Sequence, residues 1–244
     1  MALFDAVLEL ADDHLVLGHR VSEWCGHAPM LEEDLALPNM ALDLIGTART
    51  LYDYAATLEG LGQTEDDMAY LRNEREYRNL LLCERPNEDF AHTILRQLYF
   101  AAFMEPYWTQ ALDSEDDVIR GVAGKAVKEM AYHIRHAGEW VIRLGDGTEE
   151  SARRIKDAVE ALHIYTDELF EESAADGVSG LPSRAAIRPA WEATIDQIFA
   201  AALLSRPVVQ YPQSGGRAGR HGESLGHLLA EMQSVYRAHP GATW

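Results

Sequence analysis

The chain has 244 residues and carries 21 Lys plus Arg against 40 Asp plus Glu, which gives a formal net charge of −19. A chain this acidic lacks the cations that bind nucleic-acid phosphates or anionic lipid headgroups, so neither is an expected partner. No apolar run approaches the ~20 residues that span a bilayer. The acidic N-terminal segment is unlike a signal peptide, which begins with basic residues.

The hydrophobic fraction is 47%, the value of an ordinary globular protein with a folded core. The two cysteines, Cys25 and Cys83, form no CxxC pair. They therefore predict neither a disulfide framework nor a zinc site, and a reducing cytoplasm is the expected compartment.

Almost the whole chain is predicted to be helical, because Ala, Leu, Glu and Arg dominate and alternating β-branched runs are scarce. In chain order, the expected helices cover residues 3–24, 33–58, 64–83, 89–112, 114–144, 149–172, 183–204 and 225–236. Several of these helices exceed ~20 residues and are joined by short turns, which favours antiparallel neighbours in a bundle. No linker or internal repeat divides the sequence, so we expect one all-α domain over residues 1–244.

Local signals support several of these boundaries. Thr64 with Asp67 resembles the cap that opens a helix. Pro38 lies near the start of the second helix, where the missing backbone donor is either tolerated or produces a kink. Pro106 lies inside the fourth helix, where we expect a kink. Residues 206–222 contain two prolines and four glycines and are predicted to form a loop.

The fifth predicted helix places polar side chains on its inward face. Glu129, His133 and His136 fall near one face together with apolar residues. Carboxylate-bridged di-iron sites are built in this way, from a Glu-x-x-His motif on each of two helices and a Glu from each of two others. The pattern therefore raises the question of where the remaining ligands would come from.

The ligand set of such a site is incomplete in this sequence. Asp43 supplies an acid on the second helix, but Gly46 stands where the motif has His. On the fifth helix Tyr132 stands at the corresponding place after Glu129. His133 is one residue out of register, a rotation of ~100° around the helix. The predicted degenerate di-iron site consists of Glu23, Asp43, Gly46, Glu129, Tyr132 and His133.

Two interpretations of this cluster stay open. The cluster is an active di-iron or single-metal oxygenase site that uses Glu23, Asp43, Glu129 and His133, or it is a metal-free network. Buried charge is tolerated only when it is paired, so a network requires partners for the acids. The candidate cations are Arg20, Arg49, Lys125 and Lys128. Further polar candidates near such a site are Asp12, Asp13, His14 and His19 on the first helix and Asp89, His92 and Gln97 on the fourth.

A set of strings extends from the first helix to the C-terminus. They lie at residues 23–29 (EWCGHAP), 42–46 (LDLIG), 79–87, 128–133, 188–192 (RPAWE) and 229–244. Together these strings resemble the PaaC-type subunits of bacterial phenylacetyl-CoA epoxidase. The string at residues 23–29 is quite specific, whereas the helical patterns alone are not.

This resemblance implies a ferritin-like helical bundle with additional C-terminal helices. In the family, the complex forms the ring epoxide of phenylacetyl-CoA with O2 and electrons from NADPH, and a homologous sister subunit holds the di-iron centre. The PaaC-type subunit is a structural partner, and further subunits supply an assembly bridge and a reductase. The resemblance thus implies no catalytic residue, no metal and no cofactor in this chain. A self-associating scaffold without a redox partner is a second alternative, and a homodimer is then the form expected of the chain alone.

The segment from residue 197 to residue 222 is locally basic. It contains Arg206, Arg217, Arg220 and His221 and no carboxylate. One interpretation is docking of an anionic surface, which belongs to another subunit, to the reductase or to the phosphates of a CoA ester. The other interpretation is a solvated, mobile loop whose arginines offset neighbouring acids. The sequence does not decide between them.

Overall fold

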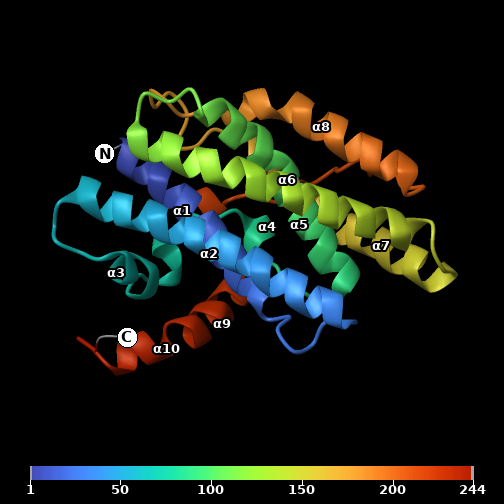
Figure 1. Cartoon of the computed structure of the whole chain (residues 1–244), viewed down its shortest axis with the longest axis horizontal. Coiled ribbons are helices and arrows are strands. Elements are labelled where there is room, and N and C mark those ends of the chain that lie inside the picture. Colours follow the sequence, from blue (N-terminus) through green and yellow to red (C-terminus); the bar gives the residue numbers. More distant parts are fainter. Residues whose placement is uncertain (1, 243–244) are drawn as a thin grey trace.

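Four long helices form the centre of the molecule in the computed structural model, which describes residues 2–242. They are α1 (Ala2–Ser22), α2 (Leu31–Glu59), α5 (Phe90–Ala111) and α6 (Asp117–Gly145). Helices α1 and α2 pack as one antiparallel pair and α5 and α6 as a second, and α2 also contacts α6 (Figure 1). This arrangement confirms the predicted all-α, ferritin-like bundle.

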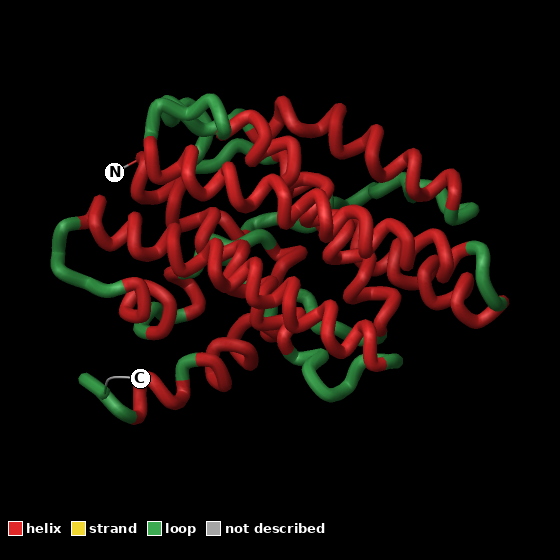
Figure 2. Tube along the Cα trace, in the orientation of Figure 1, coloured by secondary structure: helices red, strands yellow, loops and turns green. Residues whose placement is uncertain are grey.

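Further helices surround this bundle. Helix α7 (Glu149–Leu162) packs on α5 and α6, and α8 (Arg184–Ala201) packs mainly on α5 (Figure 1). The shorter helices are α3 (Glu65–Tyr70), α4 (Leu81–Glu84), α9 (Glu223–Met232) and α10 (Ser234–Ala238). Over residues 2–242 the chain consists of helices, turns and loops without a strand (Figure 2). None of the helices in this part is both long and apolar enough to cross a bilayer.

Helix α5 is buried in the hydrophobic core. Asp89 caps its start by accepting a hydrogen bond from the His92 backbone N–H. Phe100, Phe103 and Trp108 are fully buried although they lie on different sides of the helix. A helix that is apolar all round is enclosed by its neighbours, which here include α1, α6, α7 and α8. The helix continues without a break through Pro106.

The prediction of one helix over residues 64–83 is wrong for most of this range. The structure has α3 up to Tyr70, a 3₁₀ turn and the single-turn helix α4. Between them, the backbone N–H of Arg78 donates to Asp12 at 2.7 Å and that of Leu80 donates to Asp13 at 2.7 Å. These backbone donors are satisfied by carboxylates of α1, so a continuous helix is not required there.

The predicted sixth helix is too long for a similar reason. It ends at Leu162 and is followed by 3₁₀ turns at His163–Tyr165 and Asp167–Phe170. The second turn brings the Glu168 carboxylate inward, where it accepts from the backbone N–H groups of Leu81, Gly215 and Gly216. A regular helix would place this side chain elsewhere.

The predicted last helix is divided into α9 and α10 at Gln233. The side-chain amide of Gln233 is buried, and it donates to the Arg72 carbonyl at 2.9 Å and to the Tyr77 hydroxyl at 3.2 Å. These hydrogen bonds connect the junction of α9 and α10 to the segment between α3 and α4.

Candidate functional site

The predicted site residues that the structure brings together lie between α2, α5 and α6. His133 on α6 is fully buried, and its Nε2 atom lies 3.1 Å from Oδ2 of Asp43 on α2. Its other ring nitrogen, Nδ1, lies 2.9 Å from the side-chain nitrogen of Gln97 on α5. Since the Gln97 amide donates to Nδ1, Nε2 carries the ring proton and donates it to Asp43.

Glu129, one turn before His133, has a different partner. Its Oε1 atom is 2.9 Å from the Lys125 ammonium on the same helix. Burial raises the pKa of Glu129 and the nearby Asp43 carboxylate acts in the same direction, whereas the Lys125 ammonium opposes the shift. The other carboxylate oxygen, Oε2, is buried without a hydrogen-bond partner among the described residues.

Gly46 on α2 faces this lysine. A Cβ atom at Gly46 would lie 3.5 Å from Lys125 Nζ, and it meets no other atom within 4 Å among the described residues. The missing side chain thus leaves room for the ammonium beside Glu129. Lys125 itself remains more than half exposed.

Tyr132 does not point into this cluster. Its side chain is 38% exposed, and its ring contacts the Arg135 guanidinium and the rings of His133 and His136. His133, the residue out of register in the di-iron motif, is therefore the one that faces inward. The 100° step between successive helical residues explains why only one of the two can do so.

Glu23 lies apart from the other acids. It follows α1, forms an ion pair with Arg20 at 2.8 Å and accepts a hydrogen bond from Asn87 at 2.8 Å. The structure thus places Asp43, Gly46, Glu129 and His133 around one point and assigns Glu23 and Tyr132 to other surroundings.

The donor set does not fit a di-iron centre. Within residues 2–242, no group of three or more His, Cys, Asp or Glu side chains is arranged to hold a metal ion. Asp43 is already bound to His133, and Glu129 is bound to a cation of the protein itself. Since a di-iron site needs four carboxylates and two histidines, no step of an oxygenation can be assigned to these residues.

A second polar cluster, around Asp12 and Asp13 of α1, was missed as a unit from the sequence. Asp12 accepts from the Tyr52 hydroxyl at 2.6 Å and forms an ion pair with Arg72. Asp13 forms an ion pair with Arg217 at 2.6 Å. Both aspartates are fully buried. The sequence did contain a signal for this cluster: Asp12 and Asp13 are adjacent acids in the middle of an apolar helix, and buried acids require partners.

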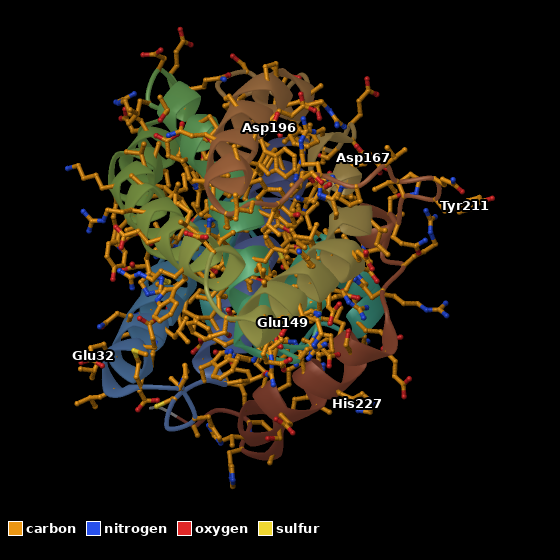
Figure 3. The ribbon with its side chains drawn as sticks, turned by 90° about the vertical axis from the view of Figure 1, so that its right-hand side faces the viewer. Glu32, Glu149, Asp167, Asp196, Tyr211 and His227 are labelled. Carbon is orange, nitrogen blue, oxygen red and sulfur yellow. The ribbon has the colours of Figure 1, made fainter. Side chains whose placement is uncertain are left out.

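The basic segment, residues 197–222, contains both paired and unpaired cationic side chains in the structure. Arg206 forms ion pairs with two acids of α8, Asp196 at 2.7 Å and Glu192 at 3.3 Å. Figure 3 marks Asp196 and also Tyr211, an exposed residue of the basic segment. Arg217 is directed inward onto Asp13. Arg206 is thus paired at the surface and Arg217 in the interior, so neither guanidinium group is free to dock a ligand.

His221 is paired as well. Its Nδ1 atom lies 2.7 Å from Oε2 of Glu84, and its Nε2 atom lies 3.0 Å from the Tyr77 carbonyl. Burial opposes protonation of His221, but the Glu84 carboxylate and the Tyr77 carbonyl outweigh it and raise its pKa. Of the four predicted docking residues, only Arg220 is exposed and has no carboxylate within ion-pair distance among the described residues.

An apolar surface lies on the outer side of α2. Leu31, Leu35 and Leu42 are each between 60% and 70% exposed. Their spacing places them on one side of the helix. Tyr132 on the neighbouring helix α6 is also exposed, and the residue after it, His133, bonds to Asp43 of α2. These four residues are called the leucine face below.

Comparison with known proteins agrees with the motifs. The family model described as "Phenylacetic acid catabolic protein" matches residues 1–244. The chain is also 43% identical over 243 residues to the C subunit of 1,2-phenylacetyl-CoA epoxidase from Escherichia coli (strain K12), with 97% of each chain covered. Trp244, which ends the last motif, lies outside the described residues. The resemblance drawn from the strings is thereby confirmed, and the chain belongs to the phenylacetic acid catabolic protein family.

Proposed function

We propose that this chain is a non-catalytic, structural subunit of a phenylacetyl-CoA epoxidase and that it pairs with a homologous subunit that carries the di-iron centre. Further oxygenase subunits and a reductase complete the proposed complex, which operates in the cytoplasm during phenylacetate catabolism. The proposal is supported by the similarity to the Escherichia coli epoxidase component.

The observation that carries the proposal is the pairing of the inner acids. Asp43 and Glu129 lie where a bundle of this kind holds metal-binding carboxylates, but each already has a partner in this protein. The His133 ring donates a hydrogen bond to Asp43, and the Lys125 ammonium forms an ion pair with Glu129. Acids with such partners are tolerated inside the bundle without a metal. The chain therefore has the fold of a di-iron subunit, and its inner acids do not require a metal ion as a partner.

The leucine face supplies the surface for the partner. Burying the exposed part of each leucine stabilises a complex by about 1–2 kcal/mol. The acids behind this face, Asp43 and Glu129, are already bound by His133 and Lys125, so a partner covers the face without burying an acid that lacks a hydrogen-bonding partner. Lys128, exposed one turn before Tyr132, lies at the edge of the face. The surface that matches the leucine face and Lys128 is an apolar pair of helices on the partner, with acidic residues at its edge.

Iron content and oxygenase turnover test the function directly. The chain is expressed with added iron, first alone and then together with its di-iron partner. We expect no stoichiometric iron and no turnover for the chain alone, and activity in the complex. About two irons per chain with reductant-dependent O2 consumption would instead make this chain an oxygenase in its own right.

Substitutions on the leucine face test the pairing. The double variant Leu35→Glu/Leu42→Glu is expected to lose co-purification with the di-iron subunit while its circular dichroism stays that of the parent. The control is Leu61→Glu, the same change at a residue that is 74% exposed beyond the end of α2. If the double variant still forms the complex, the leucine face is not the interface. If the parent chain forms only homodimers, the pairing proposal is wrong and a self-associating scaffold is favoured.

A further inference from the structure

Four arginines gather around the loop at residues 213–222, which is called the glycine loop here. Arg75, Arg78, Arg85 and Arg220 have no carboxylate within ion-pair distance among the described residues. Most other arginines of this acidic chain are paired with acids. A local group of unpaired guanidinium groups in a protein of charge −19 requires an explanation.

The glycine loop is held in place at both ends. Glu168 accepts from the backbone N–H groups of Gly215 and Gly216, at 2.8 and 2.7 Å. Glu84 accepts from the backbone N–H of Gly222 at 2.7 Å and pairs with His221. Both carboxylates are almost fully buried. A loop anchored in this way presents its exposed side chain, Arg220, from a fixed backbone, which lowers the entropy lost on binding a ligand.

A cleft of about 360 Å³ opens between the glycine loop and α4. Arg85 and Arg220 line it, together with three neutral residues that can donate hydrogen bonds: Tyr165, Gln213 and Ser214. The Arg85 guanidinium lies 5.1 Å from the centre of the Tyr165 ring, which orients it. Arg220 also lines a neighbouring cleft of about 530 Å³ that contains Arg75 and the Glu74 carboxylate.

The acid in this cleft does not compete for the arginines. Glu84 is the one carboxylate among the lining residues, and its oxygens already bind Asn79, His221 and the Gly222 N–H. The cleft therefore offers two guanidinium groups and neutral donors to a ligand. Guanidinium groups bind phosphate oxygens with charge-assisted, often paired hydrogen bonds.

We propose that the cleft between Arg85 and Arg220 binds a phosphate group of a small molecule. The concave shape favours a small ligand over the broad surface of a protein. Its volume accommodates a phosphate together with part of the molecule that carries it. The proposal does not depend on pairing with a catalytic subunit, because binding to the isolated chain tests it.

Isothermal titration calorimetry of the full chain at low ionic strength tests this site. The probes are inorganic pyrophosphate and coenzyme A, which separate a free phosphate from a phosphate ester. The variants are Arg220→Gln and Arg85→Gln. The control is Arg143→Gln, which makes the same charge change on the exposed surface of α6. Circular dichroism confirms that each variant is folded.

We expect saturable binding of coenzyme A that weakens about tenfold in either cleft variant and stays unchanged in the control. Equal binding of pyrophosphate would identify the phosphate groups as the whole determinant, and weaker binding would assign part of it to the nucleotide; both outcomes support the site. Absence of saturable binding by either probe would overturn the proposal. An equal loss in the Arg143→Gln control would also overturn it, since that result indicates general charge attraction.

Discussion

Asp13 and Arg217 are separated by 204 residues in sequence and form one of the most buried ion pairs of the protein. Asp13 is fully buried and the Arg217 side chain is 10% exposed. In addition, Arg217 donates to the carbonyls of Glu9 and Arg78, which satisfies most of its donors. An ion pair in such surroundings depends on both partners, because either one alone is a buried, uncompensated charge.

Replacing Arg217 is therefore predicted to be costly. Arg217→Gln is expected to lower the free energy of unfolding by about 3–5 kcal/mol, because it leaves Asp13 buried without a counter-charge. The matched control is Arg206→Gln in the same basic segment, whose ion pairs lie at the surface and contribute about 0–1 kcal/mol. Urea denaturation of both variants measures the difference. Equal effects of the two substitutions would contradict the assignment of separate roles.

At the scale of elements, α6 shows how closely helices approach each other here. A Cβ atom at Gly145, the last residue of α6, would lie 2.0 Å from the carbonyl oxygen of Ala202, which follows α8. A Cβ atom at Gly121, near the start of the same helix, would meet no atom within 4 Å among the described residues. One glycine is thus required by packing, and the other is not.

The two glycines are predicted to respond to alanine with opposite signs. Gly145→Ala is expected to destabilise the protein by about 1–3 kcal/mol, because the backbone of Ala202 must move. Gly121→Ala is expected to stabilise it by about 0.5–1 kcal/mol, because alanine loses less backbone entropy in a helix. Thermal unfolding of the isolated chain measures both, and a stabilising Gly145→Ala would show that the α6–α8 contact is looser than described.

At the scale of the whole molecule, buried histidines make stability depend on pH. Burial lowers the pKa of His14, His19 and His163 to about 4 each. In the unfolded chain these groups bind protons near pH 6.5. Between about pH 6.5 and pH 4 the unfolded state therefore holds more protons, so these histidines make the protein less stable as the pH falls. His221 acts in the opposite direction, because its pKa is raised: its contribution is present at low pH and is lost as the pH rises through its folded value.

This balance predicts a pH effect that one substitution reduces. His14→Gln removes a fully buried, neutral histidine, so the loss of unfolding free energy near pH 5 is expected to be smaller by up to about 1.4 kcal/mol per pH unit. The control is His227→Gln, which makes the same change at an exposed histidine. Urea denaturation at a series of pH values between 4.5 and 7 measures the slopes. Identical slopes for His14→Gln and the parent would contradict the assigned cause.

The sequence by itself determined the long helices, because their signals are local. Apolar residues repeat with the helical period in α1, α2, α5 and α6, and caps such as Asp89 act within one turn. The family motifs are also local strings, so the family was recognisable before the structure. The absence of two histidines, at Gly46 and Tyr132, already argued against a complete di-iron ligand set.

Only the tertiary structure decided which polar residues meet. The segment between α3 and α4 is not helical because Asp12 and Asp13, more than 60 residues earlier, accept its backbone N–H groups. His133 rather than Tyr132 faces inward because Asp43 and Gln97, on two other helices, bind its ring. Arg217 and Arg220 lie three residues apart, yet one is buried on Asp13 and the other is free at a cleft. Such pairings depend on distances between elements that are remote in the chain, and local periodicity contains no information about those distances.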